Sequence, residues 1–162
     1  MYFKSFPYTY YSLDNTTSVQ VVTNLTTRVT LSDEVKNNLS LYDEYDIKDG
    51  ETPELVADKF YNNPELHWLV LHYNEIIDPR FDWPLDTNNL NRYVASKYAN
   101  VNAIHHYEDN NGYYVNSTVP GCVSVSNYEY EDIVNESKRR IKILKSNYVD
   151  PIVTDFKRKL GE

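Results

Sequence analysis

Apolar residues alternate with polar ones near the start of the chain, from Val19 to Leu31. Because successive side chains of a strand point to opposite faces, this spacing predicts a strand. A shorter alternation predicts a second strand over 42–48, after a turn or short helix at 32–39. Residues 1–17 are rich in aromatic side chains, have no helical period and are interrupted by Pro7, so we expect an extended arm there.

Two helix start signals follow in the middle of the chain. Thr52-Pro53-Glu54 combines an N-cap hydroxyl, a proline at the first helical position and an acid in the first turn. Asn63-Pro64-Glu65 repeats the signal. Apolar residues at helical spacing follow each start and end near Tyr61 and Asn74. The pattern predicts two short helices packed as a tight hairpin.

The second half of the chain mixes further short elements. An irregular apolar connection over 76–85 leads to a helix that Asp86 can cap. The Asp-Asn-Asn-Gly sequence at 109–112 predicts the turn of a β-hairpin. The remaining predicted elements are a helix over 128–138, a strand over 141–143 and a last helix over 149–160.

These elements predict an α+β fold, because they lack the regular alternation of a doubly wound sheet. We expect three segments along the chain. They are an N-terminal arm and strand over 1–41, a central domain over 42–100, and a C-terminal hairpin-helix-strand-helix region over 101–162.

Charge narrows the choice of partners. The net charge of the 162 residues is −8, which argues against binding to nucleic acid or anionic membranes, because such binding needs clustered lysine and arginine. The charge is uneven, with −12 over 1–135 and +4 over 136–162. Opposite charges in one small chain suit head-to-tail contact with neighbouring proteins, and they equally suit helix-dipole complementation and solubility.

Few residues suggest chemistry. His67 and His72 do not share a helical face, and His105 and His106 are adjacent on a predicted strand. The single cysteine, Cys122, excludes an internal disulfide framework and favours a small packed residue over an activated thiolate. We expect no catalytic, metal-binding or cofactor-binding residue. No apolar run has the length of a transmembrane helix or a secretion signal, so we expect synthesis and use in a cytosol.

The aromatic content is high, with 16 Tyr, 5 Phe and 2 Trp. Because Trp68 and Tyr73 lie inside a predicted helix, we expect them to pack in the core or at a domain interface. The arm is harder to bury within the same chain, and extended aromatic segments at a terminus typically dock on something. We therefore expect the arm to dock on a partner, with burial in the same chain as the alternative. Its candidates are Tyr2, Phe3, Phe6, Tyr8 and Tyr10.

The stretch Tyr45–Tyr61 is similar to the opening strand, Gly-acid-Thr turn and first helix of the LysM module, a βααβ unit. Leu66–Asn74 followed by Ile76 stands where that family has its second helix and Asn-x-Ile loop. Pro53 departs from the family, and Ile77–Leu85 replaces its closing strand. The resemblance implies glycan-binding loops at Gly50–Pro53 and Asn74–Pro79.

A longer resemblance covers most of residues 1–160. The chain resembles the baseplate wedge subunit of contractile-tailed bacteriophages of the T-even type. The motifs that carry it are Phe6-Pro7, Thr23–Arg28, Asp49–Glu54, His67–Leu71, Trp83-Pro84-Leu85 and Lys138–Leu144.

This resemblance implies a structural protein of the virion tail baseplate, assembled in the host cytoplasm, without enzymatic activity. It would bind other wedge subunits and join them during baseplate assembly, with no nucleic acid, membrane or small-molecule ligand. Trp83, Arg139 and Arg140 join the arm residues as docking candidates.

Two alternatives remain open from the residues. Tyr45–Tyr61 allows a peptidoglycan-binding LysM-type module, although neither repeated modules nor an attached catalytic domain accompany it. The surplus of carboxylates allows a tail-associated wall hydrolase, because glycoside hydrolysis uses paired acids.

Overall fold

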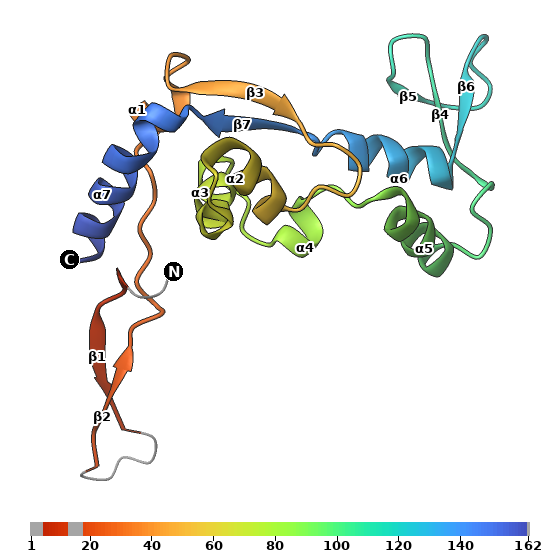
Figure 1. Ribbon diagram of the computed structural model, residues 1–162. Coiled ribbons are helices and arrows are strands. Elements are labelled where there is room, and N and C mark those ends of the chain that lie inside the picture. Colours follow the sequence, from red (N-terminus) through yellow and green to blue (C-terminus); the bar gives the residue numbers. More distant parts are fainter. Residues whose placement is uncertain (1–4, 13–17, 162) are drawn as a thin grey trace. The chain divides into compact units, whose positions relative to one another are not determined.

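The computed structural model describes residues 5–12 and 18–161 and contains two compact units. Unit 1 comprises Met1–Tyr45, Thr52–Ile77 and Lys142–Glu162, and unit 2 comprises Asp46–Glu51 and Asp78–Ile141. The units group residues by contact in space and therefore cut across the three segments expected along the sequence. Those segments stay a prediction. Helices and strands are mixed in the described residues, which confirms the α+β class (Figure 1).

Unit 1 carries most of the elements of the first half of the chain. They are β1 (Tyr8–Tyr11), β2 (Gln20–Thr23), α1 (Asp33–Asn37), β3 (Tyr42–Asp46), α2 (Pro53–Tyr61), a 3₁₀ turn at Pro64–Leu66, and α3 (His67–Tyr73). After unit 2 come β7 (Arg140–Leu144), a 3₁₀ turn at Ser146–Tyr148, and α7 (Val149–Leu160). The first two residues of β7 and the last residue of β3 belong to unit 2 in this division.

The first strand is shorter than its alternation predicts. β2 ends at Thr23, so the expected strand over 19–31 is wrong beyond that residue. The Asn24 side chain explains the stop, because its Oδ1 accepts the Thr26 N–H at 3.0 Å and closes a turn. Leu31, the last residue of the alternation, is buried in the core without being part of a strand.

The first central helix begins where its sequence signal predicts, whereas the second signal starts a 3₁₀ turn and α3 begins three residues later, at His67. The Thr52 hydroxyl accepts the Leu55 N–H at the start of α2, and Pro53 occupies the first helical position. Asn62, in the left-handed region at φ 51°, ends α2. Asn63 then caps the 3₁₀ turn that leads into α3.

β3 pairs with a strand from far along the chain. Lys145 donates its N–H to the Leu41 carbonyl at 2.9 Å, and Ile47 donates to the Arg139 carbonyl at 2.9 Å. These bonds lie at opposite ends of β3 and β7, so the two strands run antiparallel, as their arrows show in Figure 1. A β-α-α-β order results, with the whole of 78–139 between the second helix and the closing strand.

Aromatic side chains dominate the core of unit 1. Trp68 packs on Phe156 of α7 with ring centres 4.7 Å apart, and Tyr42 of β3 meets Tyr73 of α3 at 6.1 Å. This confirms the core assignment of Trp68 and Tyr73. The remaining buried members of the cluster are Phe6, Leu31, Leu69, Leu144, Val149 and Leu160.

Unit 2 contains helices and a small sheet. Its elements are α4 (Pro79–Asp82), α5 (Thr87–Lys97), β4 (Ile104–Glu108), β5 (Tyr114–Val115), β6 (Val123–Ser126) and α6 (Asn127–Glu136). The sheet order is β5-β4-β6, which confirms the hairpin at 109–112 and adds β6, a strand that the sequence pattern did not indicate. α6 begins with a capping box between Ser126 and Glu129.

A buried carboxylate joins the helices of unit 2. Glu131 of α6 accepts hydrogen bonds from Lys97 Nζ and from the Tyr98 hydroxyl, both at 2.7 Å. Burial raises the pKa of Glu131. The hydrogen bonds from Lys97 and Tyr98 lower it by more, so the net shift of this pKa is downward. The charge is therefore kept and paired inside the unit.

Candidate docking surfaces

The β1–β2 hairpin exposes apolar side chains on both faces. Its register pairs Tyr8 with Thr23 and Tyr10 with Val21. Because side chains alternate across a strand, the two tyrosines and Val21 share one face. Tyr8 is 75% exposed and Tyr10 is 78% exposed, and Val21 is also exposed. Tyr11 is exposed on the other face, so the described part of unit 1 covers neither side of the hairpin.

This hairpin also lacks charge. Between Lys4 and Arg28 the sequence contains a single charged residue, Asp14. Exposed strand edges usually carry charges or prolines that prevent pairing with another chain, and a two-stranded ribbon buries little by itself. A bare apolar ribbon of this kind is typical of a surface that becomes covered on association.

The aromatic residues of the predicted arm do not share one environment. Tyr2 and Phe3 lie outside the described residues. Phe6 is 7% exposed and belongs to the core of unit 1, whereas Tyr8 and Tyr10 face solvent on β1. The ring of Phe6 is thus covered by its own chain, and its predicted part in docking stays a prediction.

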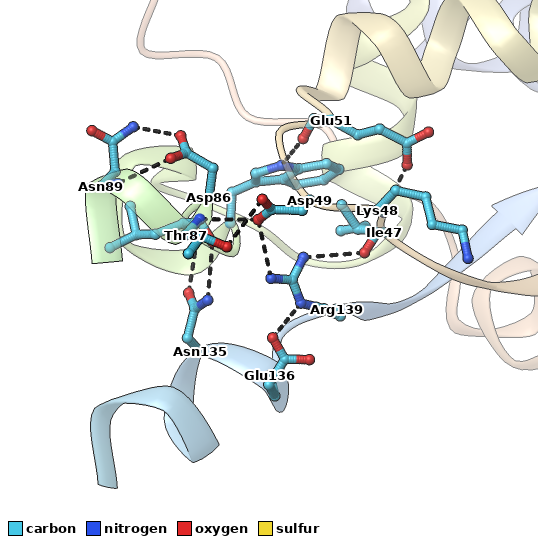
Figure 2. Close-up of polar contacts among 12 residues, drawn as sticks. Ile47, Lys48, Asp49, Glu51, Asp86, Thr87, Asn89, Asn135, Glu136 and Arg139 are labelled. Atoms are coloured by element: carbon cyan, nitrogen blue, oxygen red, sulfur yellow. Dashed lines mark hydrogen bonds and ion pairs between the residues drawn. The ribbon is translucent and has the colours of Figure 1, made fainter. Parts of the chain in front are cut away.

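Trp83, another predicted docking residue, is buried in unit 2. Its indole Nε1 donates to the Glu51 carbonyl at 2.8 Å. The Glu51 carboxylate in turn accepts the Lys48 N–H at 2.8 Å and closes the turn around Gly50 (Figure 2). The indole therefore fixes the 48–51 turn, and its role in docking is not tested by this geometry.

Arg139 is held by a network inside unit 2 (Figure 2). Its Nε donates to Glu136 at 2.5 Å and its Nη1 donates to the Ile47 carbonyl at 3.2 Å. Its Nη2 lies 3.6 Å from Asp49, whose carboxylate also accepts the N–H and hydroxyl of Thr87, each at 3.0 Å. The guanidinium thus connects the C-terminal end of α6 to the 47–49 segment. Asp49 of that segment in turn binds Thr87 at the start of α5. Arg140, the next residue, is exposed at the start of β7.

Asn135 is a structural residue that sequence reasoning missed. It is buried near the end of α6, where its Oδ1 accepts the Leu85 N–H at 2.7 Å and its Nδ2 donates to the Leu85 carbonyl at 3.0 Å. An asparagine on a helix carries no signal for such a pairing, because the partner is a backbone group 50 positions away.

The residues that correspond to LysM glycan loops have internal partners. The Thr52 hydroxyl caps α2. Asn74 donates from Nδ2 to the Val70 carbonyl at 2.9 Å and to the Lys142 carbonyl at 2.8 Å, while its Oδ1 accepts the Lys142 N–H at 2.7 Å. These groups serve the fold of unit 1.

The histidine side chains take part in aromatic packing and in local hydrogen bonds. Burial against aromatic rings lowers the pKa of His72. In unit 2, His105 and His106 face each other through their Nδ1 atoms at 2.8 Å, and His106 Nε2 lies 2.8 Å from Glu108. Over residues 5–12 and 18–161, no group of three or more His, Cys, Asp or Glu side chains is arranged to hold a metal ion.

Helices of the described chain are too short or too polar to cross a membrane. The exposed, uncharged hairpin and the internally paired polar residues are together typical of a structural protein that assembles with others.

Comparison with known proteins agrees with this class. Residues 1–120 match the family described as Base plate wedge protein 53. The chain is also similar to the baseplate wedge protein gp53 of Enterobacteria phage T4, with 24% identity over 139 residues, covering 70% of this chain and 71% of that protein.

The chain belongs to the Base plate wedge protein 53 family. Its role is that of a structural component of the baseplate wedge in the phage tail.

Proposed function

We propose that the β1–β2 hairpin is the surface through which this chain joins other subunits of the baseplate wedge. The observation that carries the proposal is the exposure of Tyr8 and Tyr10 on an uncharged ribbon. Tyrosine adds a large, rigid contact area at low entropic cost, and such residues are enriched among the strongest contributors to protein interfaces.

The partner expected for the hairpin is an apolar protein surface or an open sheet edge. Because Asp14 is the only charged residue between Lys4 and Arg28, the hairpin lacks the charges that bind nucleic acid or a charged ligand. The contact would thus depend on burial of apolar area and change little with salt. Arg140, exposed on β7, is a separate and charged candidate contact.

Co-expression with the other wedge proteins of the same phage tests the proposal. A Tyr8→Ser/Tyr10→Ser variant should lose co-purification by about tenfold or more, because truncated aromatic anchors commonly cost that much affinity. A Tyr113→Ser/Tyr114→Ser variant is the matched control, because those two tyrosines are similarly exposed on the hairpin of unit 2. Equal recovery of the first variant and the wild type would refute the proposal.

The other parts of the proposal follow from the family. The chain would act without catalysis, cofactor or small-molecule ligand, and it would assemble into the baseplate in the host cytoplasm.

Incubation with cell-wall sacculi tests the wall-hydrolase alternative, because hydrolysis lowers the turbidity of the suspension. A steady fall in turbidity that depends on the protein would contradict a purely structural role.

We further propose that β3, α2, α3 and β7 form a LysM-like βααβ module interrupted by residues 78–139. The antiparallel β3–β7 pairing, the capped helix α2 and the capped 3₁₀ turn before α3 support this arrangement. Internal use of Asn74 and Thr52 favours a structural module over the peptidoglycan-binding alternative. Saturable binding to sacculi in a pelleting assay would reverse that preference.

A further inference from the structure

A second exposed apolar surface lies in unit 2, between β6 and α6. It is a groove of about 240 Å³ lined by Val123, Ser124, Val125, Glu129, Asp132 and Ile133. Val125 is buried and forms apolar floor, whereas Val123 and Ile133 are exposed. The groove therefore presents solvent-exposed aliphatic side chains.

An open strand edge runs beside this groove. β6 pairs with β4, and no described strand pairs with its other side. Its sequence, Val-Ser-Val-Ser over 123–126, contains none of the charges or prolines that usually protect an edge. Such an edge can accept an added strand, because an extended segment can hydrogen-bond to its backbone while its alternate side chains enter the neighbouring groove.

The charge of the groove selects the partner. Glu129 and Asp132 are acidic, and no basic residue lines the groove. The Ser126 N–H donates to the Glu129 carboxylate at 2.7 Å, and this bond keeps the carboxylate ionised. Asp132 is partly exposed in the groove lining beside exposed Ile133, so its carboxylate can pair with a partner's charge.

We propose that the β6–α6 groove docks an extended segment of another protein. At every second position this segment faces the groove, and there it carries aliphatic residues together with lysine or arginine. The aliphatic side chains would contact Val123 and Ile133, and a basic side chain would pair with Asp132. This surface goes beyond the hairpin of unit 1, because it selects its partner by charge as well as by apolar area.

A labelled peptide with valine and lysine at successive groove-facing positions and serine between them tests the proposal on the full chain. Its counterpart carries glutamate in place of lysine. Fluorescence anisotropy should show saturable binding of the basic peptide and none of the acidic one. Binding should weaken as salt is raised, because an exposed ion pair is screened. Absence of binding, or equal binding of both peptides, would overturn the proposal.

Substitutions in the groove give the second arm of the test. Ile133→Ser and Asp132→Lys should each weaken binding of the basic peptide by about tenfold, the change expected for loss of one well-placed contact. Leu55→Ser is the matched control for Ile133, because the two residues are 55% and 56% exposed on helices. Unchanged affinity in both groove variants would overturn the proposal.

The geometry of docking has its own readout. Of the Ser124 and Val125 amides, the one whose N–H points away from β4 should exchange more slowly when the basic peptide is added, because strand addition protects the open edge of β6. Protection of α6 alone would contradict strand addition. The Tyr8→Ser/Tyr10→Ser variant should bind the peptide as the wild type does, which separates failure of this inference from failure of the hairpin proposal.

Discussion

Asn74 pairs with the backbone of Lys142 in both directions. Its Nδ2 donates to the Lys142 carbonyl at 2.8 Å and its Oδ1 accepts the Lys142 N–H at 2.7 Å. The side chain thus bonds both polar groups of the Lys142 backbone, as the backbone of a neighbouring strand would. One asparagine at the end of α3 therefore secures the strand that closes unit 1.

Replacement of Asn74 tests this role. Asn74→Ala should lower the free energy of unfolding by about 2 kcal/mol, because it leaves partly buried peptide groups of Val70 and Lys142 without their partners. Urea denaturation followed by circular dichroism measures the change. Asn91→Ala on the exposed face of α5 is the control and should change stability little. Equal stability of the two variants would show that water replaces the Asn74 bonds.

Phe6 should matter for stability more than for assembly. Phe6→Ala should lower the free energy of unfolding by about 3 kcal/mol, because the ring is buried in the core of unit 1. Tyr8→Ala, two residues away and exposed, should cost far less. A deletion of 1–11 removes both rings at once, so single substitutions are needed to separate folding from docking.

Tyr73 should make the protein sensitive to alkali. Burial raises the pKa of Tyr73 to about 12 from the model-compound value of 10.0, and its hydroxyl donates to the Val35 carbonyl. The neutral phenol is favoured in the folded state, so its stabilisation is complete below pH 10 and is lost as the pH rises toward 12. Thermal unfolding of wild type and Tyr73→Phe across this window should show a smaller loss in the variant. Parallel curves would contradict the assignment.

His72 should make the protein sensitive to acid. Burial lowers the pKa of His72 below its usual value of 6.5, so the unfolded chain binds the proton more readily. The contribution of neutral His72 to the free energy of unfolding is therefore complete above pH 6.5 and is lost as the pH falls below that value. His72→Gln should flatten the melting temperature between neutral pH and about pH 5. A slope in His72→Gln equal to that of the wild type would contradict the assignment.

Local signals predicted much of the fold. Thr52 and Asp86 cap helices where their sequence contexts indicate, and the turn at 109–112 closes a hairpin. Capping and tight turns depend on residues within a few positions of one another, and a sequence pattern contains that information. The strand predicted over 19–31 ends at Thr23, because the Asn24 side chain forms a turn there instead of allowing the strand to continue.

The candidate docking surfaces were harder to predict. The aromatic arm drew attention to Tyr8 and Tyr10, but the same pattern included Phe6, which the core of unit 1 covers. Trp83 and Arg139 hold the 47–51 turn, and β6 with its groove had no sequence signal. Exposure depends on what the rest of the chain covers, which composition and spacing do not contain.

The sequence alone determined the mixed fold class, several caps and turns, the aromatic N-terminus with few charges, and the resemblance to baseplate wedge proteins. Only the tertiary structure decided that β3 pairs with β7, that Asn74 pairs with Lys142, and which aromatic rings remain in solvent. The reason is physical. Caps and turns are short-range interactions written in neighbouring residues, whereas strand pairing and burial are settled by packing between segments distant in the chain.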